Sequence, residues 1–152
     1  MLGQDVPLDT ERGYNTTLPR PGVELSRPVC VAERSFFMTP MAMGLRIGGA
    51  VELAGLEAKP NFARAKALLS LGAEALPGLN LADGREWMGF RPSMPDSKPV
   101  ISRSPRHANV LMAFGHGHLG LTQGATTGRL IGELASSQPT SIDLSPFRID
   151  RF

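Results

Sequence analysis

Apolar and polar residues alternate along this chain with two different periods. Stretches rich in β-branched and aromatic residues predict short strands. These stretches are residues 13–18, 28–39, 45–53, 86–91, 100–103 and 109–113. Apolar side chains recur at helical spacing over residues 61–76 and again from about Leu121 to Ser136, which predicts two helices. We therefore expect an α+β fold, in which an antiparallel or mixed sheet packs on the first helix and a C-terminal strand, glycine turn and helix follow.

Other positions carry further expectations. Residues 1–12 form a polar connection, and the tail after Pro139 is expected to be extended and to lie over the surface. Cys30 lies in an apolar segment, which predicts a buried thiol rather than a nucleophile. Large apolar side chains of the strand pair fill the core or line a side-chain pocket, and core is the simpler expectation. These side chains are Phe36, Phe37, Met38, Met41 and Met43.

Composition narrows the class of protein. The 152 residues, 41% of them hydrophobic, suffice for one domain with a core. The net charge of +2 is small and the basic residues are scattered, which argues against a nucleic-acid surface. A single cysteine excludes an internal disulfide and a cysteine-rich zinc site. Without an apolar run of transmembrane length or a signal-peptide pattern, we expect a cytoplasmic protein, with a position at the periphery of the inner membrane as the alternative.

A glycine-rich turn joins the last predicted strand to the last predicted helix. Such a turn leaves backbone N–H groups free at a helix N-terminus, which is typical of a receptor for an anion or a carbonyl oxygen. Glycines at 120, 124 and 128 place a bare stripe on one helix face, where a flat molecule or another backbone can approach. The alternative is a glycine-rich helix start that packs on a sheet. The turn comprises Gly115, His116, Gly117, His118, Leu119, Gly120, Leu121 and Thr122.

Arg91 is the leading candidate for a binding side chain. It follows a strand of large apolar residues, and Pro92 biases its backbone toward an extended conformation. A guanidinium held in this way can bind a carboxylate through two parallel charge-assisted hydrogen bonds. Spacing alone favours equally a structural ion pair between Arg91 and either Asp96 or Glu86.

His116 and His118 would point the same way on an extended segment, as two metal ligands do. No third ligand stands at a convincing position, since Asp96 lies in a different loop. We therefore expect imidazoles that order the turn or contact a cofactor, and a metal hydrolase is the weaker alternative. No serine lies in a GxSxG context, so no nucleophilic triad is expected.

Two motifs in order carry a family resemblance. The pattern WxGFRPxxPDxxPVI, which begins at Trp87, is followed by GHGxxGLT from Gly115. Together they resemble the C-terminal part of the FAD-dependent D-amino-acid dehydrogenases and, more distantly, D-amino-acid oxidase and glycine oxidase. The likeness extends upstream, so that it spans nearly the whole chain. The upstream pieces are Pro7-Leu8, Arg12-Gly13-Tyr14, Leu45-Arg46-Ile47-Gly48-Gly49 and the region of Gly55.

The resemblance implies roles and a domain organisation. Arg91 would bind the α-carboxylate of an amino-acid substrate, Tyr14 would line the substrate cavity, and residues 115–122 would lie beside the pyrimidine end of the flavin. Residues 1–99 would form part of a substrate domain, residues 100–140 the C-terminal part of an FAD-binding domain, and residues 141–152 an extended tail. The GxGxxG turn that holds the ADP half of FAD is absent from these 152 residues. We therefore expect a C-terminal fragment that does not retain FAD and is inactive alone.

The function that the resemblance implies is oxidative deamination of D-amino acids or related amines, by hydride transfer to FAD. The alternative is a non-catalytic binding or assembly module that keeps the fold without the cofactor. Expected partners are a small amino-acid substrate, and either a second copy of the chain or an N-terminal FAD domain. No acid–base residue is expected to be required if the amine binds neutral.

Overall fold

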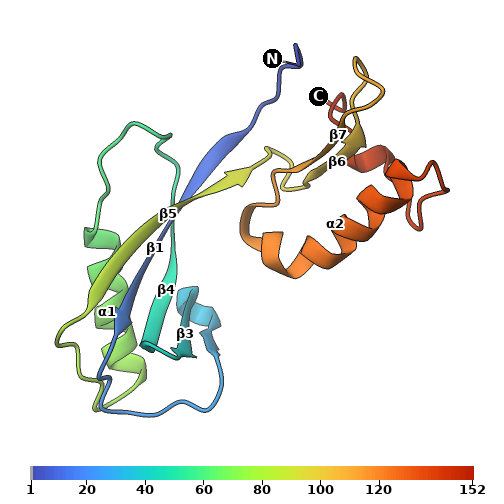
Figure 1. The fold of residues 1–152 in the computed structure, drawn as a ribbon. Helices are drawn as coiled ribbons and strands as arrows, with labels where there is room; N and C mark the ends of the chain where they lie inside the picture. The colour runs from blue at the N-terminus through green and yellow to red at the C-terminus, as the bar shows by residue number, and fades with distance from the viewer. Residues whose placement is uncertain (1) are drawn as a thin grey trace. The chain divides into compact units, whose positions relative to one another are not determined.

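The computed structural model describes residues 2–152, which divide into two compact units. Residues 12–90 form one unit, and residues 2–11 with 91–152 form the other. Nine main elements follow one another along the chain (Figure 1). They are β1 (Asp9–Leu18), β2 (Val29–Val31), β3 (Phe36–Met41), β4 (Gly44–Glu52), α1 (Ala63–Ala75), β5 (Arg85–Ser93), β6 (Val100–Arg103), β7 (Leu111–Phe114) and α2 (Gly120–Ala135). This mixture of antiparallel sheets and helices confirms the expected α+β class.

The larger sheet has the strand order β2-β3-β4-β1-β5, with antiparallel pairing of β1 with β4, of β2 with β3 and of β3 with β4. Helix α1 packs against β4 (Figure 1). Pro92 lies in β5, an edge strand, which is where sheets tolerate proline. The core between sheet and helix consists of Leu18, Phe36, Met38, Leu45, Ile47 and Leu68.

A glycine lets α1 lie close to the sheet. A Cβ atom at Gly72 would be 2.6 Å from Cδ1 of Ile47, so a larger residue would crowd this buried side chain between α1 and β4. The helix begins where the Oδ1 atom of Asn61 accepts a hydrogen bond from the backbone N–H of Ala63, 3.2 Å away. It ends before Pro77-Gly78, and the φ of +88° at Gly78 is a conformation that favours glycine.

Strand alternation decides which side chains face α1 and which face away from it. Phe36 and Met38 are buried toward the helix, whereas Phe37 between them is 51% exposed. Cys30 pairs with Phe37 on this uncovered face and is exposed, so the expectation of a buried thiol is wrong. Met41 and Met43 are exposed as well, and the expectation that Phe37 and Met41 fill the core is also wrong.

Two boundaries differ from the sequence prediction. The predicted strand over residues 28–39 is interrupted by a 3-10 turn at Ala32–Arg34, after which Ser35 adopts a φ of +53°. Residues 9–12, expected to be an irregular connection, extend β1 toward the N-terminus, where Arg12 pairs with Glu52 of β4. These departures depend on pairing with distant strands, which local composition does not encode.

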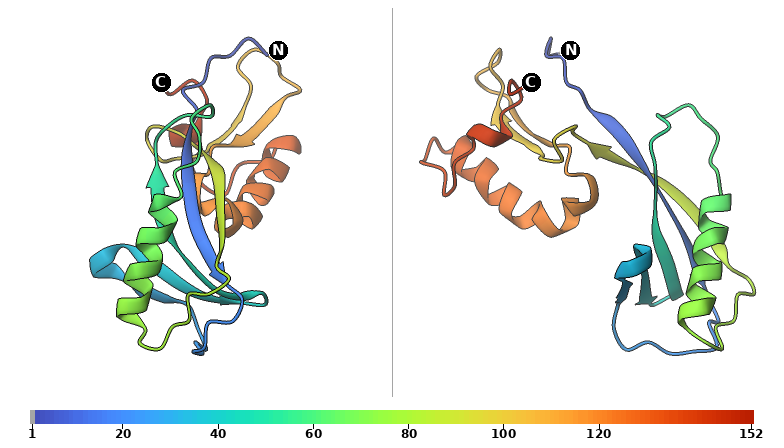
Figure 2. Two further views of the ribbon diagram at one scale, coloured as in Figure 1. Left: turned by 90° about the vertical axis from the view of Figure 1, so that its left-hand side faces the viewer. Right: turned by 180° about the vertical axis from the view of Figure 1, so that it is seen from behind.

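The second unit is built on the hairpin of β6 and β7, against which α2 packs (Figure 2). Its core contains Met94, Val100, Met112 and Ile149. Ile149 belongs to the C-terminal tail and is only 3% exposed. The tail also includes a 3-10 turn at Ser145–Phe147, and Arg151 forms an ion pair with Asp96. Most of the tail is exposed, as a segment that lies over the surface would be, and Ile149 and Arg151 anchor it to the second unit.

Candidate functional site

The turn between β7 and α2 depends on two glycines with positive φ. Gly115 has a φ of +78° and Gly117 a φ of +50°. A Cβ atom at Gly115 would lie 2.8 Å from Cγ of Met94, and one at Gly117 would lie 2.9 Å from Oγ of Ser93. Both the backbone conformation and the space around the turn therefore favour glycine at these positions.

Helix α2 begins directly after this turn with an open N-terminus. A 3-10 turn over Gly117–Leu119 leads into it, and the N–H of Leu119 donates to the carbonyl oxygen of His116 at 2.9 Å. No side chain caps the helix, and its first turn contains no acidic residue. The first N–H groups of a helix have no intrahelical acceptor and carry the positive end of the helix dipole. This end of α2 can therefore bind an anion or a carbonyl oxygen.

The glycine stripe of α2 is open on its outer face. Nothing lies within 4 Å of the Cβ positions of Gly124, Gly128 and Gly132 within residues 2–152. Leu121, in the first turn, is 99% exposed. Of the predicted stripe, Gly124 and Gly128 are therefore open, whereas the Cβ position of Gly120 lies 3.5 Å from Cβ of His116 in the turn.

The two histidines of the turn bind different partners. Nε2 of His116 lies 2.9 Å from Oγ1 of Thr127, which is eleven residues later and belongs to α2. Burial lowers the pKa of His116 below its usual range, so this imidazole is neutral at neutral pH. His118 is exposed and pairs with Glu11. The arrangement fits the expected ordering role of His116, which joins the turn to the body of the helix.

Arg91 belongs to the same unit as the turn. Ser93, two residues after Arg91, forms an antiparallel bridge with His116, so the end of β5 lies against the turn. Nη1 of Arg91 is buried without a hydrogen-bond partner within residues 2–152. Asp96, one proposed structural partner, instead forms ion pairs with Arg151 and Lys98. Arg91 therefore has an unused donor, as a ligand-binding guanidinium requires.

Tyr14 lies in the other unit and is only 1% exposed. Its hydroxyl donates to Oε2 of Glu52 at 2.5 Å and accepts from the N–H of Asn61 at 3.0 Å. Its ring makes an edge-to-face contact with Phe62. Tyr14 therefore ties the end of β4 to the start of α1.

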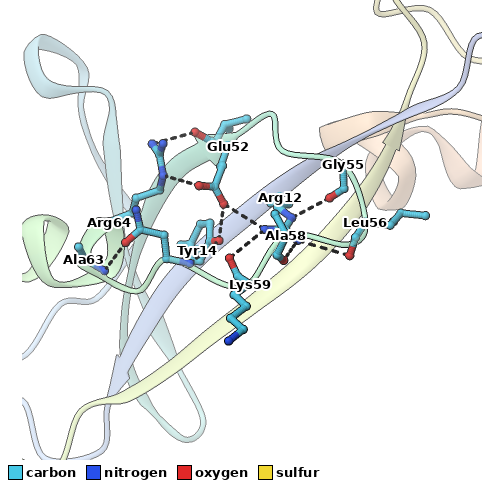
Figure 3. Close-up of polar contacts among 11 residues, drawn as sticks. Arg12, Tyr14, Glu52, Gly55, Leu56, Ala58, Lys59, Ala63 and Arg64 are labelled. Carbon is cyan, nitrogen blue, oxygen red and sulfur yellow. Dashed lines mark hydrogen bonds and ion pairs between the residues drawn. The ribbon is translucent and has the colours of Figure 1, made fainter.

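Arg12 is the centre of a polar network that the sequence analysis did not identify (Figure 3). The side chain is fully buried and pairs with Glu52, and the ring of Phe90 lies 5.4 Å from its guanidinium carbon. It donates hydrogen bonds to backbone carbonyl oxygens of the loop after β4, which it fixes in place. These carbonyls belong to Gly55, Leu56, Ala58 and Lys59. The pairing of Arg12 with Glu52, forty residues later, is visible only in the strand register, so local sequence patterns do not predict this network.

Hydrogen bonds from Tyr14 and Arg12 and the charge of Arg64 hold the pKa of Glu52 below its usual range. Glu52 is therefore ionised at neutral pH and can compensate the buried charge of Arg12. An ionised carboxylate has no proton to donate, and its lowered pKa and its three hydrogen-bond donors make it a weak base, so this network is suited to positioning rather than to acid–base chemistry.

Solved structures with this fold include an iminodiacetate oxidase and a glycine oxidase. The iminodiacetate oxidase from Chelativorans sp. BNC1 is 27% identical, with a TM-score of 0.81 over 97% of this chain and 41% of that one. The glycine oxidase from Geobacillus kaustophilus shares the fold with a TM-score of 0.82 at 20% identity, over 99% of this chain and 41% of that one.

The sequence comparisons establish the family. The model described as "DAO: FAD dependent oxidoreductase" matches residues 1–134, and the chain belongs to this family. A D-amino-acid oxidase from Bradyrhizobium diazoefficiens is 37% identical over 99% of this chain and 37% of its own length. A D-amino acid dehydrogenase from Paramagnetospirillum magneticum is 31% identical over 99% of this chain and 36% of its own length. The chain thus spans little more than a third of these curated relatives.

Within residues 2–152, no helix combines the length and the apolar character that a membrane span requires.

Proposed function

We propose that this chain supplies the carboxylate anchor and the pyrimidine-side flavin contact of an FAD-dependent enzyme that oxidatively deaminates D-amino acids or related amines. The observation that carries the proposal is the unpartnered, buried Nη1 of Arg91 on a strand whose end bridges to the glycine turn. The names of the relatives, a D-amino-acid oxidase and D-amino acid dehydrogenases, support this substrate class.

Arg91 is suited to binding the substrate's α-carboxylate. The extended backbone before Pro92 fixes the direction of the side chain. Because no acidic residue within residues 2–152 forms an ion pair with Arg91, the guanidinium can bind a ligand carboxylate without breaking an existing ion pair. Two parallel hydrogen bonds would fix both the position and the plane of that carboxylate, and therefore the direction of the substrate Cα.

The glycine turn fits the pyrimidine end of a flavin. Uncapped N–H groups at the start of a 16-residue helix can donate to a ring carbonyl oxygen, and the Cβ-free positions of the turn permit close approach. Residues 115–122, with the hydroxyl of Thr122, would hold this end of the ring. The dipole of α2 would stabilise negative charge that develops there on reduction.

The chemistry that FAD supplies when bound is acceptance of a hydride from the substrate Cα. The protein groups then have to orient the substrate and stabilise charge. His116 is held by Thr127 and is neutral, so it orders the turn without adding a charge beside the ring. Tyr14 remains a candidate for the cavity wall in its unit. Its hydroxyl is buried and already bonds to Glu52 and Asn61, so Tyr14 would support this wall by holding the loop before α1 rather than by a hydrogen bond to the substrate.

The test uses the full-length enzyme that contains this chain, with Arg91→Met. We expect KM for D-amino acids to rise at least about thirtyfold, corresponding to loss of about 2 kcal/mol or more from a buried charged pair. Flavin content, measured by visible absorbance, should stay near the wild-type value. Arg106→Met, at an exposed arginine of the same unit, is the matched control and should leave KM unchanged. An unchanged KM in Arg91→Met would place the carboxylate site elsewhere.

A further inference from the structure

His118 and Glu11 form a pair that the proposed function does not use. Nε2 of His118 lies 2.5 Å from Oε2 of Glu11, and both residues belong to the same unit as Arg91 and the glycine turn. Glu11 comes from β1, whereas His118 comes from the 3-10 turn that leads into α2. The pair therefore joins the start of the sheet to the turn before the helix.

Glu11 and Arg91 lie on one face of the sheet. β1 and β5 are neighbours that run in opposite directions (Figure 1), and the guanidinium of Arg12 lies 5.4 Å from the ring of Phe90. Side chains alternate between the two faces along each strand, so the next residues, Glu11 and Arg91, both point away from this contact. The pair of Glu11 with His118 and the unpartnered Nη1 of Arg91 therefore belong to the same face and the same end of the two strands.

Glu11 fixes the tautomer of His118. An ionised carboxylate only accepts hydrogen bonds, so Nε2 of His118 carries the proton that it donates, and Nδ1 keeps a free lone pair. Nδ1 has no hydrogen-bond partner within residues 2–152, and the side chain is 51% exposed. A carboxylate in this position also stabilises the imidazolium that forms when Nδ1 takes up a proton. His118 is therefore an accessible and oriented proton acceptor.

The other charged and titratable groups of the neighbouring segments do not compete for this role. On β1, Asp9 accepts a hydrogen bond from the adjacent backbone N–H. On β5, Arg91 would be neutralised by the substrate carboxylate. His116 in the same turn is neutral and bound to α2, and the first turn of that helix, residues 120–123, carries no charge. Within the described residues, Glu11 is thus the one charged partner of His118.

Oxidation of an amino acid requires the loss of a proton from nitrogen. At neutral pH the amino group is an ammonium ion, because its pKa lies well above 7. A hydride can leave Cα only from the neutral amine, whose lone pair forms the C=N bond of the imine. Water is a weak base and removes this proton slowly, whereas an imidazole changes charge near neutral pH and accepts it readily.

We propose that His118 is the proton acceptor for the substrate's ammonium group and that Glu11 is its positioning residue. This inference rests on the proposed function, in which Arg91 binds the carboxylate of the same substrate. Nδ1 of His118 forms a new N–H bond as one N–H bond of the ammonium group breaks. The electron pair of the broken bond stays on the substrate nitrogen, and the positive charge moves to the imidazole beside Glu11.

The tautomer can be measured directly in this chain, which has only three histidines. In nitrogen NMR spectra at about pH 8, the Nδ1 resonance of His118 should be that of an unprotonated nitrogen. The resonance is assigned by its loss in His118→Gln. Glu11→Gln should shift the population toward the tautomer with the proton on Nδ1. A wild-type His118 that carries its proton on Nδ1 would overturn the proposal.

The pH profile of the full-length enzyme tests the role in the reaction. At about pH 7, His118→Gln should lower kcat/KM for D-amino acids by about tenfold or more. The loss should shrink as the pH rises and disappear near about pH 10, where the substrate amine is already largely neutral. Glu11→Gln should show a smaller loss with the same trend. His107→Gln, at an exposed histidine of the same unit, should retain the wild-type profile.

A purely structural role of His118 predicts a loss that does not depend on pH. Parallel profiles of the wild type and His118→Gln, at equal flavin content, would therefore overturn the proposal, as would unchanged activity at about pH 7. If Arg91→Met still raises KM in that case, the proposed function stands and only the role of His118 fails. A wild-type enzyme that oxidises no D-amino acid would reject both.

Discussion

Arg12 and Glu52 lie directly opposite each other on the antiparallel strands β1 and β4, with Nη1 of Arg12 3.4 Å from Oε2 of Glu52. The pair is placed where β4 ends and the loop to α1 begins. Arg12 holds the carbonyl oxygens of this loop while Tyr14 holds the N–H of Asn61 at its far end. A buried charge thus organises a loop that has few apolar contacts of its own, and this organisation accounts for the burial of an arginine in a strand.

Arg12→Met should destabilise the chain strongly. Methionine keeps much of the apolar stem but removes the charged donors to the loop carbonyls and to Glu52, which costs about 3 kcal/mol in the free energy of unfolding. Urea unfolding followed by circular dichroism measures the change. The control is Arg34→Met, whose ion pair with Glu74 is more than half exposed on both sides, and it should shift the free energy by less than about 0.5 kcal/mol. Equal effects in the two variants would contradict the role of Arg12 in holding the loop after β4.

Acidification should weaken the same network. The pKa of Glu52 is lowered from its usual 4.5 by the hydrogen bond from Tyr14 and by Arg12 and Arg64. A carboxylate with a lowered pKa in the folded state stabilises the fold above pH 4.5, and this contribution is lost as the pH falls toward the lower, folded-state pKa. Asp96, whose pKa is lowered mainly by its hydrogen bonds with Arg151, adds to the same trend.

Urea unfolding across the acidic range tests this sign. As the pH is lowered, the free energy of unfolding should decrease more steeply in the wild type than in Glu52→Gln, in which residue 52 no longer titrates. Glu24→Gln, at an exposed glutamate of the same unit, should retain the wild-type slope. If Glu52→Gln and the wild type have parallel profiles, Glu52 does not couple protonation to folding.

Two glycines that look alike in the sequence should respond in opposite ways to alanine. Gly115→Ala should destabilise by about 1–3 kcal/mol because its φ is +78° and its Cβ would lie 2.8 Å from Cγ of Met94. Gly124→Ala should stabilise by about 0.5–1 kcal/mol, since it lies within α2 with nothing near its Cβ. Thermal unfolding of both variants measures the contrast. Destabilisation by Gly124→Ala would mean that something packs on the glycine stripe.

Much of the fold could be predicted because the elements have clear periods. The predicted helix over residues 61–76 contains the observed α1, and the predicted strand pair forms the antiparallel pairing of β3 with β4. Periodicity does not reveal which face of a strand a helix covers. Cys30 and Phe37 share the face that α1 does not cover, and the local sequence does not predict that either side chain is exposed. The anchoring of Ile149 likewise depends on residues some fifty positions earlier.

The candidate site was only partly accessible from the sequence. Arg91 and the glycine turn lie in recognisable local patterns, and the bridge between Ser93 and His116 brings the two segments together. The Arg12 network combines residues from distant parts of the chain, which the register of β1 against β4 brings together. Such sets become visible only when the strand pairing is known, because each member alone resembles an ordinary surface charge.

His116 should make stability depend on pH in a window separate from that of the carboxylates. Burial lowers its pKa below the usual 6.5, so below that pH the unfolded chain takes up a proton that the folded chain resists. The free energy of unfolding should therefore decrease as the pH is lowered from about 7 to about 5. His116→Gln, which keeps a hydrogen-bonding group near Thr127 but does not titrate, should remove this dependence. His107→Gln, at an exposed histidine, should leave it in place. A wild-type slope in His116→Gln would show that another group titrates in this range and that the imidazole of the turn is free to accept a proton in the folded chain.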